Sequence, residues 1–134
     1  MSLVIKTDAG RIKRLQRYKN LITNLPHIAQ IAVGDGGREV DETLKTPTSD
    51  RKTLYNEILR KDVTFEDVDD YSTKVLVFLD SAIDTILVGK DINEMAIIDS
   101  EGTFIALETF NLFDITTGFP SNTQTTIKTQ ITME

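Results

Sequence analysis

The chain has 134 residues and a mass of 15.0 kDa; 40% of its residues are hydrophobic and 27% are charged. This composition supplies enough apolar material for one folded core and excludes wholesale disorder. The absence of cysteine excludes disulfides, thiolate nucleophiles and thiolate metal sites, and no apolar run approaches the roughly 20 residues of a membrane-spanning helix. We therefore expect a single domain over residues 1–134, made in a cytosol-like compartment and not inserted in a membrane.

The charge is distributed unevenly along the chain. The formal net charge is −6, but residues 1–20 hold six basic residues and one acidic residue, a net charge of +5. The remaining 114 residues hold nine basic and twenty acidic residues, a net charge of −11. This separation predicts a basic N-terminal element attached to an acidic body.

The first predicted elements are an extended segment at residues 3–6 and a helix that runs from Asp8 towards Asn20. Thr7 and Asp8 supply side-chain oxygens that can cap this helix. Its apolar residues recur at helical spacing and are expected to form the packing face: Ile12, Leu15, Tyr18 and Ile22. The basic residues cluster on the other side or flank it: Arg11, Lys13, Arg14, Arg17 and Lys19.

Strand signals begin after Pro26. Residues 28–33 form a compact apolar run bounded by glycines, which is typical of a buried strand entering a turn. Residues 38–50 are polar and predict a long loop. Residues 49–53 are expected to form a helical turn that leads into the next strand.

The C-terminal half continues the strand pattern. Residues 74–79 are dense in branched and aromatic side chains, and residues 95–98 and 103–107 bracket a turn in which Gly102 can take a positive φ. Residues 123–133 alternate between the two faces of a predicted strand. One face carries apolar residues and threonines, including Met133, and the other face is more polar and more exposed to solvent. A helix followed by strands predicts an α+β fold, with an N-terminal amphipathic helix packed on a mostly antiparallel β-sheet or small β-sandwich.

Three separated segments carry a family pattern. They are a strand closing on Gly-Asp-Gly, a segment of the type Leu-x-Asn-Glu-x-x-Arg, and a hairpin from Ile92 to Ala106. The residues that define them are Gly34, Asp35, Gly36, Asn56, Glu57, Arg60, Glu94, Asp99 and Gly102. In this order and spacing, residues 3–108 resemble the N-terminal attachment domain of phage tail-collar and tail-fibre proteins. Ala96 stands where that family commonly has glycine, and residues 110–119 depart from its usual proline-containing segment.

The resemblance implies a structural component of a contractile phage-like tail or baseplate, which anchors or adapts a fibre through protein–protein interfaces. Its expected partners are other tail and baseplate proteins, a separate fibre and further copies of itself, with a trimer favoured. The expected location is the particle tail after assembly in the bacterial cytoplasm. If the 134 residues are the whole product, attachment is expected rather than host recognition.

An attachment role makes the basic residues of the first helix the candidate docking surface, because clustered arginines pair well with carboxylates. A solvated helix face and a contact with the acidic body of a neighbouring copy are the alternatives. A nucleic-acid-binding module using the same helix is the alternative function, although the acidic body repels phosphate.

No catalytic, cofactor or metal residue is predicted, so the chain is not expected to be an enzyme. Gly34–Gly37 lacks the spacing of a phosphate-binding loop, residues 66–70 lack the pattern of a calcium loop, and His27 has no triad signature. A carboxylate-based hydrolase is the least favoured function, because 21 acidic residues supply arbitrary pairs.

Overall fold

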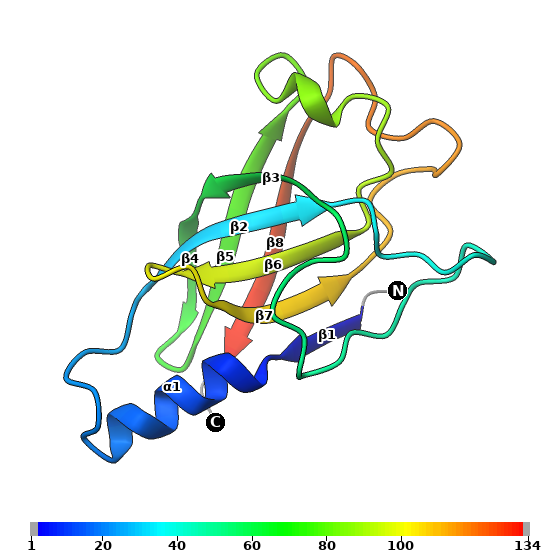
Figure 1. The fold of residues 1–134 in the computed structure, drawn as a ribbon. Helices are drawn as coiled ribbons and strands as arrows, with labels where there is room; N and C mark the ends of the chain where they lie inside the picture. The colour runs from blue at the N-terminus through cyan, green and yellow to red at the C-terminus, as the bar shows by residue number, and fades with distance from the viewer. Residues whose placement is uncertain (1–2, 133–134) are drawn as a thin grey trace.

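The computed structural model describes residues 3–132 and contains one α-helix, one short 3-10 helix and eight strands in that range (Figure 1). The elements are β1 (Leu3–Lys6), α1 (Asp8–Tyr18), β2 (Ile28–Gly34), β3 (Glu57–Asp62), β4 (Thr64–Asp69), β5 (Ser72–Asp80), η1 (Thr85–Leu87), β6 (Glu94–Asp99), β7 (Phe104–Thr109) and β8 (Gln124–Thr132). The predicted α+β fold is confirmed.

The strands form two antiparallel sheets. One has five strands in the order β1-β7-β6-β2-β3, and the other has three in the order β4-β5-β8. Strands β3 and β4 are separated only by Val63, so the chain passes from one sheet to the other at that residue. Figure 1 shows β5 and β8 passing behind β2 and β6, so the two sheets lie face to face.

The main core lies between the sheets. Alternate residues of β2 and β6 face alternate residues of β5 and β8, and the buried members are Ile31, Val33, Met95, Ile97, Val75, Val77, Leu79 and Ile127. A smaller cluster includes Leu54, Phe104 and Ile98, which come from the loop before β3, from β7 and from β6. Strand β6 is buried at every position because both clusters draw on it.

The strand predictions are confirmed for residues 28–33, for residues 74–79 and for the hairpin, in which Gly102 has a φ of +87°. Strand β8 also alternates as predicted, with Ile127 buried and its neighbours exposed. Met133, expected on the same face, lies outside the described residues.

The helical turn predicted at residues 49–53 is wrong. Residues 49–50 form an ordinary turn, in which the carbonyl of Ser49 accepts a hydrogen bond from the Asp8 N–H at 2.7 Å. Tyr55 packs its ring under the cations of Lys45 and Arg51, at 4.1 and 3.5 Å from the ring centre. An isolated turn of helix has little stability of its own. The buried side chain of Leu54 therefore outweighs the local helical preference in this loop.

Candidate functional site

The N-terminal half of α1 is fixed to the hairpin β6–β7. Thr7 caps the helix by accepting a hydrogen bond from the Gly10 N–H at 3.1 Å, and its hydroxyl donates to the Phe104 carbonyl at 2.5 Å. The Thr7 N–H donates to the Ile105 carbonyl at 3.1 Å. Because Thr7 is fully buried, these bonds satisfy groups that would otherwise be costly to bury.

Gly10 is the buried residue of α1 and lies directly against Ile105. A Cβ atom added at Gly10 would stand 3.0 Å from the Ile105 Cβ and 3.1 Å from its Cα. The helix therefore approaches β7 more closely at this position than a larger side chain would permit. The absence of a side chain at Gly10 thus determines how closely the helix packs against the sheet.

Lys13 adds an electrostatic contact to the same side of the helix. Its ammonium lies 3.0 Å from an Asp99 carboxylate oxygen and 2.8 Å from Glu101. Burial lowers the pKa of Lys13 while the hydrogen bonds to Glu101 and Asp99 raise it, and the net pKa lies above its ordinary value. The second Asp99 oxygen accepts from the N–H groups of Glu101 and Thr103, at 2.9 Å each, which closes the hairpin turn.

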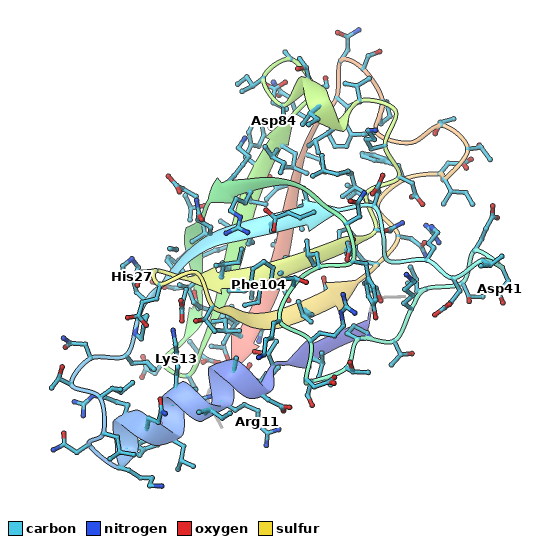
Figure 2. The ribbon with its side chains drawn as sticks, viewed as in Figure 1. Arg11, Lys13, His27, Asp41, Asp84 and Phe104 are labelled. Atoms are coloured by element: carbon cyan, nitrogen blue, oxygen red, sulfur yellow. The ribbon has the colours of Figure 1, made fainter. Side chains whose placement is uncertain are left out.

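This arrangement reverses the predicted packing of the helix. Ile12, Leu15 and Tyr18 were expected to face the core, but their exposed fractions are 54%, 56% and 79%. The helix packs instead through the side that carries Gly10 and Lys13 (Figure 2). The physical reason is that the hairpin offers two carboxylates and a surface next to Ile105, which fit a glycine and a lysine better than large apolar side chains.

The exposed side of α1 combines apolar and basic residues. At 100° per residue, Arg11 and Lys19 lie among the apolar residues on the side opposite Gly10. We call Arg11, Ile12, Leu15, Tyr18 and Lys19 the outer face of α1. Arg17 is also exposed, whereas Arg14 is half-buried. Among the five predicted docking cations, Lys13 is held in an ion pair with Asp99 and Glu101, and the docking role of the set stays a prediction.

Four of the family-pattern residues, Gly34, Gly36, Asn56 and Glu94, meet around the carboxylate of Glu94. Its Oε2 accepts from the Gly36 N–H at 2.7 Å and from the Asn56 N–H at 2.8 Å, and its Oε1 accepts from the Tyr55 N–H at 2.8 Å. The side chain is 1% exposed. One carboxylate from β6 therefore joins the end of β2 to the start of β3.

Gly34 and Gly36 are needed here for space. A Cβ atom at Gly34 would stand 2.1 Å from the Asn56 carbonyl oxygen, and one at Gly36 would stand 2.6 Å from the Tyr55 Cβ. The Asn56 side chain also donates to Asp35 at 2.5 Å. The Gly-Asp-Gly segment and the Asn56 segment are thus two halves of one joint.

Glu57 and Arg60, two further residues of the family pattern, form an ion pair at the surface of β3. The Arg60 guanidinium donates two hydrogen bonds to the Glu57 carboxylate at 2.8 Å each, and it lies 5.4 Å from the centre of the Phe104 ring. The hydrogen bonds to Glu57 raise the pKa of Arg60. The pair contacts Phe104 on the sheet face and not the turn at Asp35, which Asn56 holds.

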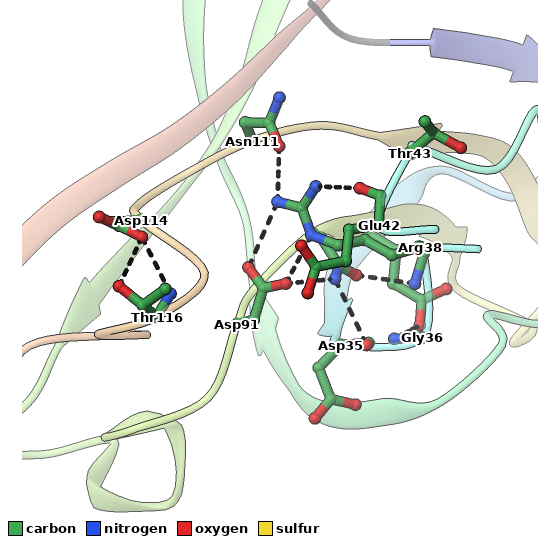
Figure 3. Close-up of polar contacts among 12 residues, drawn as sticks. Asp35, Gly36, Arg38, Glu42, Thr43, Asp91, Asn111, Asp114 and Thr116 are labelled. Carbon is green, nitrogen blue, oxygen red and sulfur yellow. Dashed lines mark hydrogen bonds and ion pairs between the residues drawn. The ribbon is translucent and has the colours of Figure 1, made fainter. Parts of the chain in front are cut away.

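A second polar joint was not found from the sequence. The Arg38 guanidinium lies 2.6 Å from Asp91, donates to the Asn111 side chain at 2.5 Å and donates to the Glu42 carbonyl at 3.1 Å (Figure 3). These residues come from three loops that are distant in sequence. No local pattern links them, and only the position of Asp91 just before the hairpin segment could have drawn attention to it.

The described residues offer no cluster suited to metal chemistry. Among them, no three side chains of His, Asp or Glu are grouped so as to hold an ion. Within the same residues, no helix has the length and hydropathy to cross a membrane. His27 lies on an exposed loop, where its carbonyl accepts from the Ser100 N–H at 2.8 Å.

Fold and surface together define a small structural domain, built from two sheets packed around an apolar core and carrying an anchored helix with an exposed outer face. A sequence model of the phage tail-collar fibre protein N-terminal family matches residues 3–133, and the chain belongs to that family. It is accordingly a non-enzymatic structural protein of the phage tail. Comparison with curated proteins and with solved structures gives no match.

Proposed function

We propose that this domain anchors or adapts a fibre on the tail or baseplate of a contractile phage-like particle, as a homotrimer that contacts other tail proteins. The observation that carries the proposal is the outer face of α1. Three large apolar side chains stay exposed there on a helix whose other side is fixed by Thr7, Gly10 and Lys13. A fixed helix with an exposed apolar side is suited to rigid docking.

The energetics favour use of this face as an interface. Full burial of a Leu, Ile or aromatic side chain is worth roughly 1.5–3 kcal/mol. Burial of Ile12, Leu15 and Tyr18 against a partner would therefore supply several kcal/mol in one place. Arg11 and Lys19 flank these residues and would favour a partner with an acidic rim.

We also propose that residues 1–134 act as one unit. The N-terminal strand β1 pairs with β7, and the C-terminal strand β8 pairs with β5 along nine residues of each strand. Both ends of the described chain are therefore part of the sheets. This supports a single rigid domain that transmits load between a tail partner and a fibre.

Co-sedimentation with tail particles assembled without this protein tests the proposal. The purified chain is expected to bind these particles saturably. The variant Arg11→Glu/Lys19→Glu is expected to bind at least about tenfold more weakly, because it places anions on the docking face. The matched control is Lys52→Glu, an exposed reversal in the loop before β3. Failure of the wild-type chain to bind tails would contradict the proposed function.

A further inference from the structure

Exposed large hydrophobic side chains gather in three regions of the chain. Thirteen such residues occur in the described structure, and five of them lie between residues 12 and 25. Three more, Phe65, Val68 and Tyr71, lie on or next to β4, and another four lie between residues 78 and 88. The acidic residues within the third region, Asp80 and Asp84, are buried, so the helix region and the β4 region are the two in which exposed apolar and exposed charged side chains occur together.

The two regions carry opposite charges. The helix region belongs to the first 20 residues, whose net charge is +5, and its outer face includes Arg11 and Lys19. Strand β4 carries Glu66, Asp67 and Asp69 between its apolar residues and is exposed at all six positions. We call Phe65, Glu66, Asp67, Val68 and Asp69 the β4 edge.

The position of β4 in the fold leaves this edge open. In the order β4-β5-β8, strand β4 is the outermost strand and pairs with β5 on one side. Acidic side chains on two such edges repel each other, so pairing of one β4 edge with another is disfavoured. A fitting occupant therefore needs apolar side chains together with cations.

The chain itself supplies an occupant of that chemistry. We propose that the outer face of α1 in one copy packs against the β4 edge of a second copy. This inference rests on the proposed homo-oligomeric role in the tail and names the partner of the docking face. Because the two surfaces differ, the contact is heterologous, and such a contact generates a ring when the rotation between copies closes. In a ring of three copies, each outer face of α1 would meet one β4 edge.

Cross-linking between single-cysteine variants of the full chain tests this contact. Because the sequence has no native cysteine, the introduced cysteine is the only thiol that the reagent can modify. Leu15→Cys and Val68→Cys are purified separately, mixed, allowed to exchange subunits and treated with a short bismaleimide. Cross-linked dimers are expected from the mixture and not from either variant alone. Val40→Cys, at a fully exposed loop position, is the control partner and is expected to give no product with Leu15→Cys.

A charge exchange provides the second measurement. Arg11→Glu/Lys19→Glu and Glu66→Lys/Asp67→Lys are each expected to weaken self-association at least about tenfold in sedimentation velocity. Combining all four changes in one chain is expected to restore association, because every contact then pairs an acidic α1 face with a basic β4 edge. Mixing the two variants is expected to restore association in part, because two of the three contacts in a ring of three then join opposite charges. A structural defect in either variant would not be repaired by the other, so restoration separates an interface from misfolding.

Several results would overturn the inference. They are a monomeric wild-type chain, cross-linking of Leu15→Cys to itself, or an oligomer whose stability neither reversal changes. If those results occur while wild-type protein still binds tail particles, the proposed attachment to the tail stands and the contact between copies is wrong; a monomeric wild-type chain would also contradict the proposed homotrimer. If wild-type protein assembles as described but ignores tails, the proposed function is wrong instead.

Discussion

Replacement of Glu94 by alanine should destabilise the domain strongly. The carboxylate accepts hydrogen bonds from the N–H groups of Gly36, Tyr55 and Asn56. Alanine would leave these three partly buried donors without their acceptor. Each unsatisfied buried group costs about 1–3 kcal/mol, and partial access of water favours the low end of that range, so the loss should be about 3 kcal/mol. That is a large share of the roughly 5–15 kcal/mol that stabilises a typical domain.

Urea unfolding followed by circular dichroism measures this loss. Glu39→Ala, which removes an exposed carboxylate from the loop after β2, is the matched control and should change stability by less than about 0.5 kcal/mol. Glu94→Gln keeps the shape of the side chain but replaces one acceptor oxygen with a donor. It should give an intermediate loss and remains measurable if the alanine variant does not fold.

Amide hydrogen exchange shows which part of the domain the Glu94→Gln change destabilises. The amides of Gly36, Tyr55 and Asn56 should exchange faster in Glu94→Gln, whereas those of β5 should change only with global stability. A Glu94→Ala variant that loses less than about 1 kcal/mol, or that matches Glu39→Ala, would refute the role of this carboxylate as the joint between β2 and β3.

Three further predictions concern the helix anchor, the pH dependence and nucleic acid. Gly10→Leu should lower the free energy of unfolding by about 1–3 kcal/mol, because its side chain must displace Ile105; unchanged urea stability would contradict this. Burial raises the pKa of Glu108 above 4.5, so the folded chain loses stability as the pH rises through that raised pKa. Glu108→Gln should therefore stabilise the domain at pH 7 and much less at pH 4; equal effects in urea titrations at the two pH values would refute this. Fluorescence anisotropy should detect no affinity for duplex or single-stranded DNA at low salt, because Lys13 is engaged internally and the body is acidic; binding that weakens with salt would revive the alternative function.

The strands were predictable because their signals are local. The dense apolar run in β5 and the turn at Gly102 need no information from distant residues. The glycines of the Gly-Asp-Gly segment are different, since they serve close approach and not a positive φ. The atoms that crowd Gly34 and Gly36 belong to Tyr55, Asn56 and Glu94, and their proximity is decided by tertiary packing.

The orientation of α1 could not be read from its own pattern. Helical spacing identified the apolar set, but it did not separate Arg11 and Lys19 from that set, and the apolar residues were assigned to the core by default. In the structure, the close approach to Ile105 of β7 leaves room only for a glycine at position 10, and Asp99 and Glu101 bind the ammonium of Lys13. A helix that packs through a glycine and a salt bridge leaves its apolar side free, and that side carries the proposed function.

The convergence at Glu94 gives the family pattern a physical meaning. Gly36, Asn56 and Glu94 lie in three separate segments of the sequence, yet one carboxylate connects all three. The pattern therefore specifies the joint that holds β2, β3 and β6 together. The surfaces that would carry attachment lie elsewhere, on α1 and β4. Asp99, another residue of the pattern, helps to hold α1 in place through its ion pair with Lys13.

Immunogold electron microscopy of intact particles, with an antibody raised against the purified chain, tests whether this protein lies where a fibre attaches to the phage tail. Label is expected at the fibre-bearing end of the tail, and at the same position on particles that carry Lys52→Glu as a control. Particles without label on the tail, with the protein recovered only free in the lysate, would contradict this location.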